Sequence, residues 1–143
     1  MKSKAILLSL LLAACSAADV TADEVARRVC ENAYTTEMEP VTDTYVLENY
    51  FGLDTGLDMA VYRCPAAAVM AEVIVIRTDD TDSALLLLEN RRNKAIERDA
   101  LYPDDKRRAE ESLTGVTGDF AYFVMGEDAD KAEDELLKAV NGR

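Results

Sequence analysis

The chain has 143 residues, the size of one ordinary domain, and 49% of them are hydrophobic, which is enough to bury a core. It carries 28 Asp and Glu against 16 Lys and Arg, a formal net charge of −12, and it has no histidine. The charge argues against binding to nucleic acid or to anionic lipid. The missing histidine excludes Ser/His/Asp triads, Cys/His dyads and histidine-rich metal sites.

The first 14 residues have the layout of a bacterial lipoprotein export signal. Lys2 and Lys4 precede the apolar stretch 5–12, which is too short to span a bilayer because a span needs about 20 apolar residues. Positions 12 to 15 read Leu-Ala-Ala-Cys, which matches the lipobox residue by residue. We therefore expect export, cleavage before Cys15 and lipid on its thiol, which places the protein on the cell membrane, facing the outside.

Residues 15–20 are then the lipidated cysteine and a short tether. The tether 16–20 reaches at most about 17 Å when fully extended. Two or three acyl chains on Cys15 anchor a protein durably, whereas one holds only marginally. We expect residues 21–143 to form a single domain close to the membrane surface.

The first part of that domain should be mostly helical. Thr21 and Glu24 form a capping-box pattern that predicts a helix to about Asn32. The polar segment 35–43 contains a proline and should be irregular. Residues 45–50 predict a short second helix.

The middle of the domain alternates strands and helices. Residues 59–63 predict a strand, and the β-branched run 72–78 predicts a strand that is buried on both faces. Residues 83–99 predict a long helix, with aspartates before it as capping residues. Proline at the start of 103–112 suits the first turn of a further helix.

The last part should complete the sheet. Residues 113–116 are a possible short strand, 120–125 predict a strand, and 128–140 predict an amphipathic helix. The sum is an α+β domain: a small, mostly antiparallel sheet of three or four strands with helices packed on it. The order of the strands does not follow from the pattern.

A set of turn and packing positions runs through this domain: Tyr50, Gly52, Leu53, Asp54, Ala71, Glu72, Val73, Val75, Ala84, Arg91, Tyr102, Pro103, Gly118, Phe120 and Val124. With these residues the chain from about Leu47 to Val140 resembles a family of small bacterial lipoproteins, mostly Gram-positive, that share a domain of unknown function. The resemblance implies a surface lipoprotein of uncharacterised role and supplies no catalytic residues.

Cys30 and Cys64 lie outside that pattern and leave two alternatives open. An exported domain favours a disulfide between them. In the chain-entropy model a bridge closing roughly 35 residues contributes about 3 to 4 kcal/mol. The alternative is two buried thiols, because Cys30 falls on the apolar face of its helix and many exported Gram-positive proteins lack disulfides.

Three charged motifs invite a functional interpretation but have simpler ones. Residues 54–56 spell the Asp-Thr-Gly triplet of aspartic proteases, yet the flanks differ and the chain is too short for two such lobes. Asp79, Asp80 and Asp82 lack the remaining ligands of a calcium loop and fit helix capping. The third motif is a group of basic residues interleaved with acidic ones, and we interpret it as a solvated, mixed-charge face: Arg91, Arg92, Lys94 and Arg98.

Two functions from different classes remain. The first is a non-catalytic module, without cofactor or metal, that presents a sheet face or groove to an envelope protein or ligand. The second is a carboxylate-based hydrolase of cell-wall material, since acidic residues are the abundant candidate catalysts. That hydrolase needs two carboxylates roughly 5 to 9 Å apart in a cleft, one of them with a raised pKa.

Overall fold

The computed structural model describes residues 19–66 and 69–142. The expected export signal and Cys15 lie outside these residues. The described part of the chain has the following elements: α1 (Ala22–Ala33), β1 (Glu39–Pro40), α2 (Thr44–Asn49), β2 (Asp58–Arg63), β3 (Glu72–Arg77), α3 (Thr81–Lys94), the π-helical turn η1 (Ala95–Asp99), α4 (Pro103–Glu111), β4 (Leu113–Thr117), β5 (Phe120–Met125) and α5 (Ala129–Asn141). None of the helices in this part is long and apolar enough to cross a bilayer.

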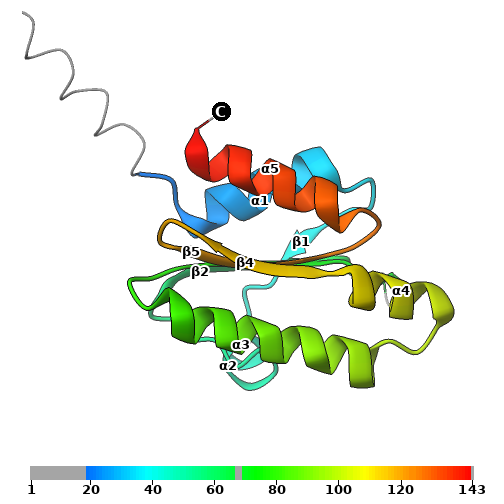
Figure 1. Cartoon of the computed structure of the whole chain (residues 1–143). Coiled ribbons are helices and arrows are strands. Elements are labelled where there is room, and N and C mark those ends of the chain that lie inside the picture. Colours follow the sequence, from blue (N-terminus) through cyan, green and yellow to red (C-terminus); the bar gives the residue numbers. More distant parts are fainter. Residues whose placement is uncertain (1–18, 67–68, 143) are drawn as a thin grey trace, which may run out of the picture.

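The strands form one sheet in the order β1-β2-β3-β5-β4, and every neighbouring pair is antiparallel. Helices α1 and α5 cover one face of this sheet, and α2, α3 and α4 lie on the other (Figure 1). The central strand β3 serves both layers. Because side chains alternate along a strand, Val73 and Val75 pack toward α1 and α5, while Ile74 and Ile76 pack toward α3. The α+β class and the doubly buried strand are therefore confirmed.

The predicted strand count was too low, because the sheet has five strands rather than three or four. The additional strand is β1, which lies inside the segment 35–43 that the sequence predicted to be irregular. Two residues are too few to show an alternating pattern, and Pro40 argues locally against a strand. A proline is nonetheless tolerated on an edge strand, where one side of the backbone needs no partner.

The predicted helices are present, with one change near the end of the longest. The capping box at Thr21 and Glu24 is confirmed, with reciprocal hydrogen bonds of 3.2 and 3.1 Å. The segment predicted as one helix to Asp99 instead changes to a π-helical turn at Ala95. Such turns are rare and often occur at functional sites.

The bend after β5 gives a test of the packing between α1 and the sheet. A Cβ added at Gly126 would collide with the ring of Tyr34, whose hydroxyl donates to the carbonyl of Met125 at 2.9 Å. We expect Gly126→Ala to lower the free energy of unfolding by about 1 to 3 kcal/mol, measured by urea denaturation. In a Tyr34→Ala background the same change should cost much less, and an equal cost in both backgrounds would contradict this packing.

Candidate functional site

A buried arginine connects helix α3 to the start of strand β3. Nε and Nη2 of Arg91 donate to the two carboxylate oxygens of Glu72 at 2.9 and 3.2 Å, and Nη1 donates to Oδ2 of Asp99 at 2.7 Å. The guanidinium also lies over the rings of Tyr50 and Phe51, 5.2 and 5.5 Å from their centres. The side chains of Arg91 and Glu72 are only 6% and 5% exposed, and that of Asp99 is 31% exposed. We call these three charged residues the Arg91 network.

The position of Arg91 corrects the expectation of a solvated basic face. Its side chain is buried, whereas the neighbouring Lys94 and Arg98 are exposed. The apolar spacing of Leu88 and Ala95 predicts the side of α3 that meets the sheet, and Arg91 falls on that same side, three residues after Leu88 and four before Ala95. Its charge is tolerated on this side because the buried carboxylate of Glu72 lies opposite it.

The Arg91 network contains two carboxylates and one guanidinium. Burial raises the pKa of Glu72, and the charge and hydrogen bonds of Arg91 oppose that rise without cancelling it. Burial lowers the pKa of Arg91, but Glu72 and Asp99 outweigh this effect and leave it above its ordinary value, so the guanidinium stays charged. The network carries one excess negative charge when both carboxylates are ionised.

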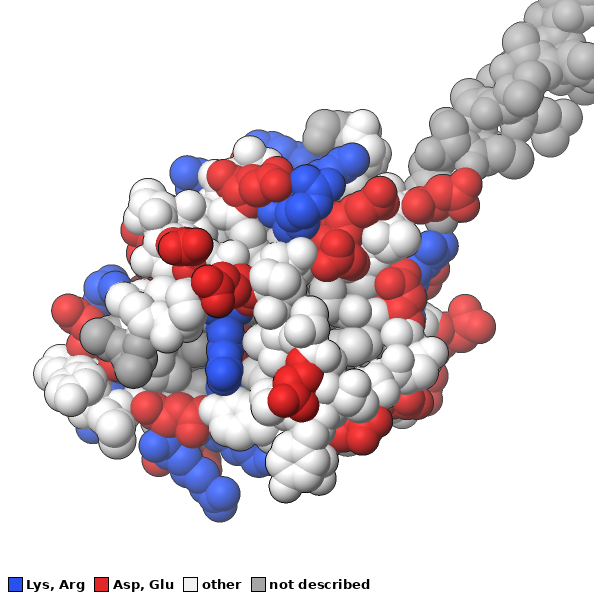
Figure 2. All heavy atoms as spheres, turned by 180° about the vertical axis from the view of Figure 1, so that it is seen from behind, with Lys and Arg blue, Asp and Glu red and all other residues white. Residues whose placement is uncertain are grey.

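An open cavity of about 640 Å³ lies beside this network, within the range of ligand-binding pockets. Glu72, Arg91 and Met125 form buried parts of its wall, and Glu39 and Arg63 are exposed on it. On the face of the molecule that Figure 2 shows, acidic and basic side chains are interspersed with uncharged surface.

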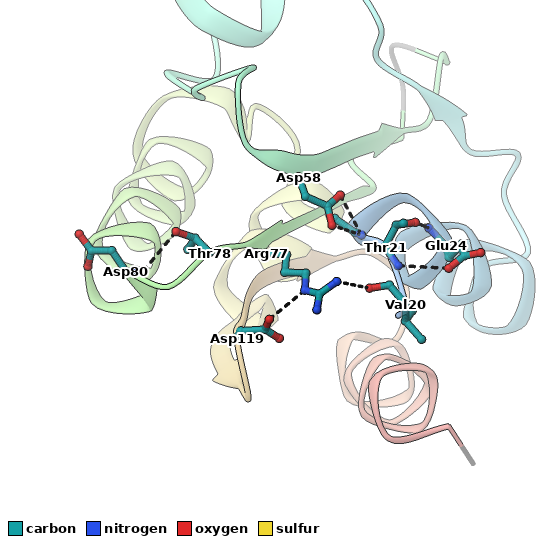
Figure 3. Close-up of polar contacts among 9 residues, drawn as sticks. Val20, Thr21, Glu24, Asp58, Arg77, Thr78, Asp80 and Asp119 are labelled. Atoms are coloured by element: carbon teal, nitrogen blue, oxygen red, sulfur yellow. Dashed lines mark hydrogen bonds and ion pairs between the residues drawn. The ribbon is translucent and has the colours of Figure 1, made fainter. Parts of the chain in front are cut away.

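The opposite end of β3 holds the start of the described chain (Figure 3). Nε of Arg77 donates to Asp119 at 2.8 Å, and Nη1 donates to the carbonyl of Val20 at 3.3 Å. The carboxylate of Asp58 accepts from the backbone N–H of Ala22 at 3.2 Å. Because Glu72 and Arg77 are five residues apart on one strand, the cavity wall lies about 17 Å along the strand from this contact.

The two cysteines are free, half-buried thiols in the structure. Burial, with smaller effects of Glu31 and Asp23, raises the pKa of Cys30 to about 12, so its thiol stays protonated and unreactive at neutral pH. Cys64 lies on the wall of the cavity. A disulfide between Cys30 and Cys64 stays a prediction for the exported protein.

The other motifs have structural roles in the described residues. Asp54 Oδ1 accepts from the N–H of Gly56 at 2.8 Å within a turn, and Asp80 caps α3 by accepting from the N–H of Ser83 at 3.1 Å. No group of three or more metal-ligating side chains converges anywhere in ranges 19–66 and 69–142. The sequence pattern did not indicate that Glu72 and Asp99 are partners of Arg91, although a charged residue at the start of a fully buried strand was a signal for Glu72.

Removing the guanidinium tests the electrostatics of the network. We expect Arg91→Met to lower the free energy of unfolding by about 3 to 5 kcal/mol at pH 7, because it leaves two carboxylates without their cation. The pKa of Glu72 should rise further in this variant. A carboxyl whose folded pKa is raised binds its proton more tightly in the folded state, so the deficit should shrink as the pH falls toward 5.

The measurement is urea unfolding followed by circular dichroism at pH 7, 6 and 5. Arg107→Met is the matched control, because Arg107 is exposed and makes only long, solvated ion pairs on α4. A deficit that stays constant with pH would show that Glu72 does not titrate as described.

Comparison with known proteins gives no relative for this chain. No family, no curated protein and no solved structure matches it.

Proposed function

We propose that this chain is a lipoprotein anchored to the outer side of a membrane through Cys15, and that its domain is a non-catalytic binding module. The anchor is supported by the lipobox at positions 12 to 15. The binding role is supported by one observation, the open cavity beside the Arg91 network. Membership of the family of small lipoproteins with a domain of unknown function is part of the same proposal.

The position of the cavity fits this role. The contact of Arg77 with Val20 holds the start of the domain at one end of β3. A tether of at most about 17 Å keeps that end near the bilayer. The cavity lies at the other end of the strand, where an envelope protein or a soluble ligand has access to it.

The Arg91 network favours binding over catalysis. Both oxygens of Glu72 accept from Arg91, which stabilises the ionised form and leaves no free oxygen to attack a substrate. A general acid must instead hold a proton and be able to transfer it. The geometry therefore supports a fixed wall better than a reactive one.

The alternative is the carboxylate-based cell-wall hydrolase, and one observation favours it. Glu72 and Asp99 line the same cavity, and the pKa of Glu72 is raised. If the protein is a binding module, purified protein should release no soluble fragments from peptidoglycan, measured by chromatography with lysozyme as the positive control. Release that disappears in Asp99→Asn, but persists in the exposed variant Asp130→Asn, would establish the hydrolase.

The anchor is tested by intact-protein mass spectrometry on the membrane fraction of expressing cells. We expect a mass that begins at Cys15 and includes diacyl or triacyl lipid. Cys15→Ser should lose the lipid and remain uncleaved, because the lipid must be added before cleavage, whereas Cys30→Ser should be lipidated normally. A soluble wild-type protein without lipid would contradict the proposal. A gain of two hydrogens on reduction would establish the bridge between Cys30 and Cys64.

A further inference from the structure

The charges on the cavity wall do not balance. Four acidic and two basic residues line it: Glu39, Asp43, Glu72, Asp99, Arg63 and Arg91. Three of the five N–H groups of Arg91 donate to Glu72 and Asp99, and these two carboxylates offset its charge, so the buried guanidinium supplies no excess positive charge to the wall. The wall therefore has a net charge of −2 when its carboxylates are ionised.

Several carboxylate oxygens on this wall are also unused within the described residues. Oδ2 of Asp99 accepts from Arg91 and from the hydroxyl of Tyr50, but no hydrogen bond involves its Oδ1. Oδ1 of Asp43 caps helix α2, which leaves its Oδ2 available. The carboxylate of Glu39 makes no hydrogen bond or ion pair in this part of the chain. These oxygens are acceptors for a donor that carries positive charge.

Most of the uncharged residues on the wall are apolar, which suits a hydrocarbon stem. Val46, Val69, Met70 and Met125 contribute aliphatic and thioether surface between the charged groups. The carboxylates do not converge as metal ligands do, since no metal-ligating group of three or more is found among the described residues. An ammonium or guanidinium on an apolar chain matches both features better than a bare ion.

We propose that this cavity binds an organic cation, in which an ammonium or guanidinium group is carried on an aliphatic stem, as in a lysine side chain or a free alkylamine. This inference rests on the proposed binding function of the same cavity and names its ligand class. The net negative charge of the whole chain also raises the local concentration of cations around it.

Arg63 is the residue that limits affinity in this proposal. It pairs across the β1–β2 ladder with Glu39, is exposed on the cavity wall, and makes no ion pair within the described residues. A bound cation is repelled by its guanidinium. Removing this charge should therefore strengthen binding, while removing the charge of Glu39 should weaken it.

Three five-carbon probes test the ligand class. Isothermal titration calorimetry of the mature lipoprotein in phosphatidylcholine nanodiscs would compare cadaverine, pentanediol and glutarate, which differ in charge and share the stem, with empty nanodiscs as the blank. We expect binding of cadaverine only, weakened by added salt. The peptide Ala-Lys-Ala distinguishes the two sources: binding of the peptide and not of cadaverine assigns a protein or peptide ligand, and the reverse assigns a free amine.

The variants locate the binding. Glu39→Gln should weaken the binding of the cationic probe about two- to fivefold, the effect of one partly exposed charge. Arg63→Gln should strengthen it by a similar factor, and Asp130→Asn, which changes the net charge on an exposed turn of α5, should leave it unchanged. Both side chains are exposed and make no ion pair within the described residues, so neither change should threaten the fold.

The outcomes distinguish a failure of the cationic ligand class from a failure of the proposed binding function. If glutarate or pentanediol binds and the cationic probes do not, and if that binding changes in the Arg63 or Glu39 variant, the cationic ligand class is overturned. The proposal that the domain is a binding module would still stand. Equal effects of Glu39→Gln and Asp130→Asn would show that the cation responds only to net charge, and would overturn the site. A failure of every probe to bind would overturn the cationic class and remove the support for binding in this cavity.

Discussion

The ion pair between Arg91 and Glu72 is the constraint on which this face of the fold depends. Glu72 begins a strand that is buried on both faces, and its carboxylate is tolerated there only with a cation beside it. The single guanidinium that supplies the charge also binds Asp99 in η1 and lies over Tyr50 and Phe51 after α2. Helix α3 is thus held to the sheet in one orientation, and the wall of the cavity is fixed by the same contacts.

The two ends of β3 are specialised in different ways. At Glu72 the charges are buried, so their interaction is barely screened and strongly constrains geometry. At Arg77 the ion pair with Asp119 is partly exposed, so it contributes little stability, but it fixes where the chain enters α1. The start of the described chain therefore lies at one end of β3, and the cavity lies at the other.

The local signals in the sequence predicted elements well and their partners poorly. The capping box at Thr21 and the β-branched strand at 72–78 depend on neighbouring residues alone, and both were confirmed. Strand β1 is only two residues long and includes Pro40, so its pairing comes from β2 rather than from its own residues. The same limit applies to Arg91. Helical spacing places Arg91 on the same side as Leu88 and Ala95, but its partner Glu72 lies on another element and is identified only by the assembled sheet.

Within the proposed binding function, the Arg91 network would provide a preformed part of the cavity wall. The hydrogen bonds from Arg91 engage both oxygens of Glu72, and they fix the position of this carboxyl group in the wall before any ligand arrives. Asp99 is held through one oxygen by Arg91 and Tyr50 and keeps the other free. A ligand that meets this oxygen need not order the side chain, so less of the interaction energy is lost to conformational entropy. This preformed oxygen is the structural basis for our proposal that the wall binds a cation.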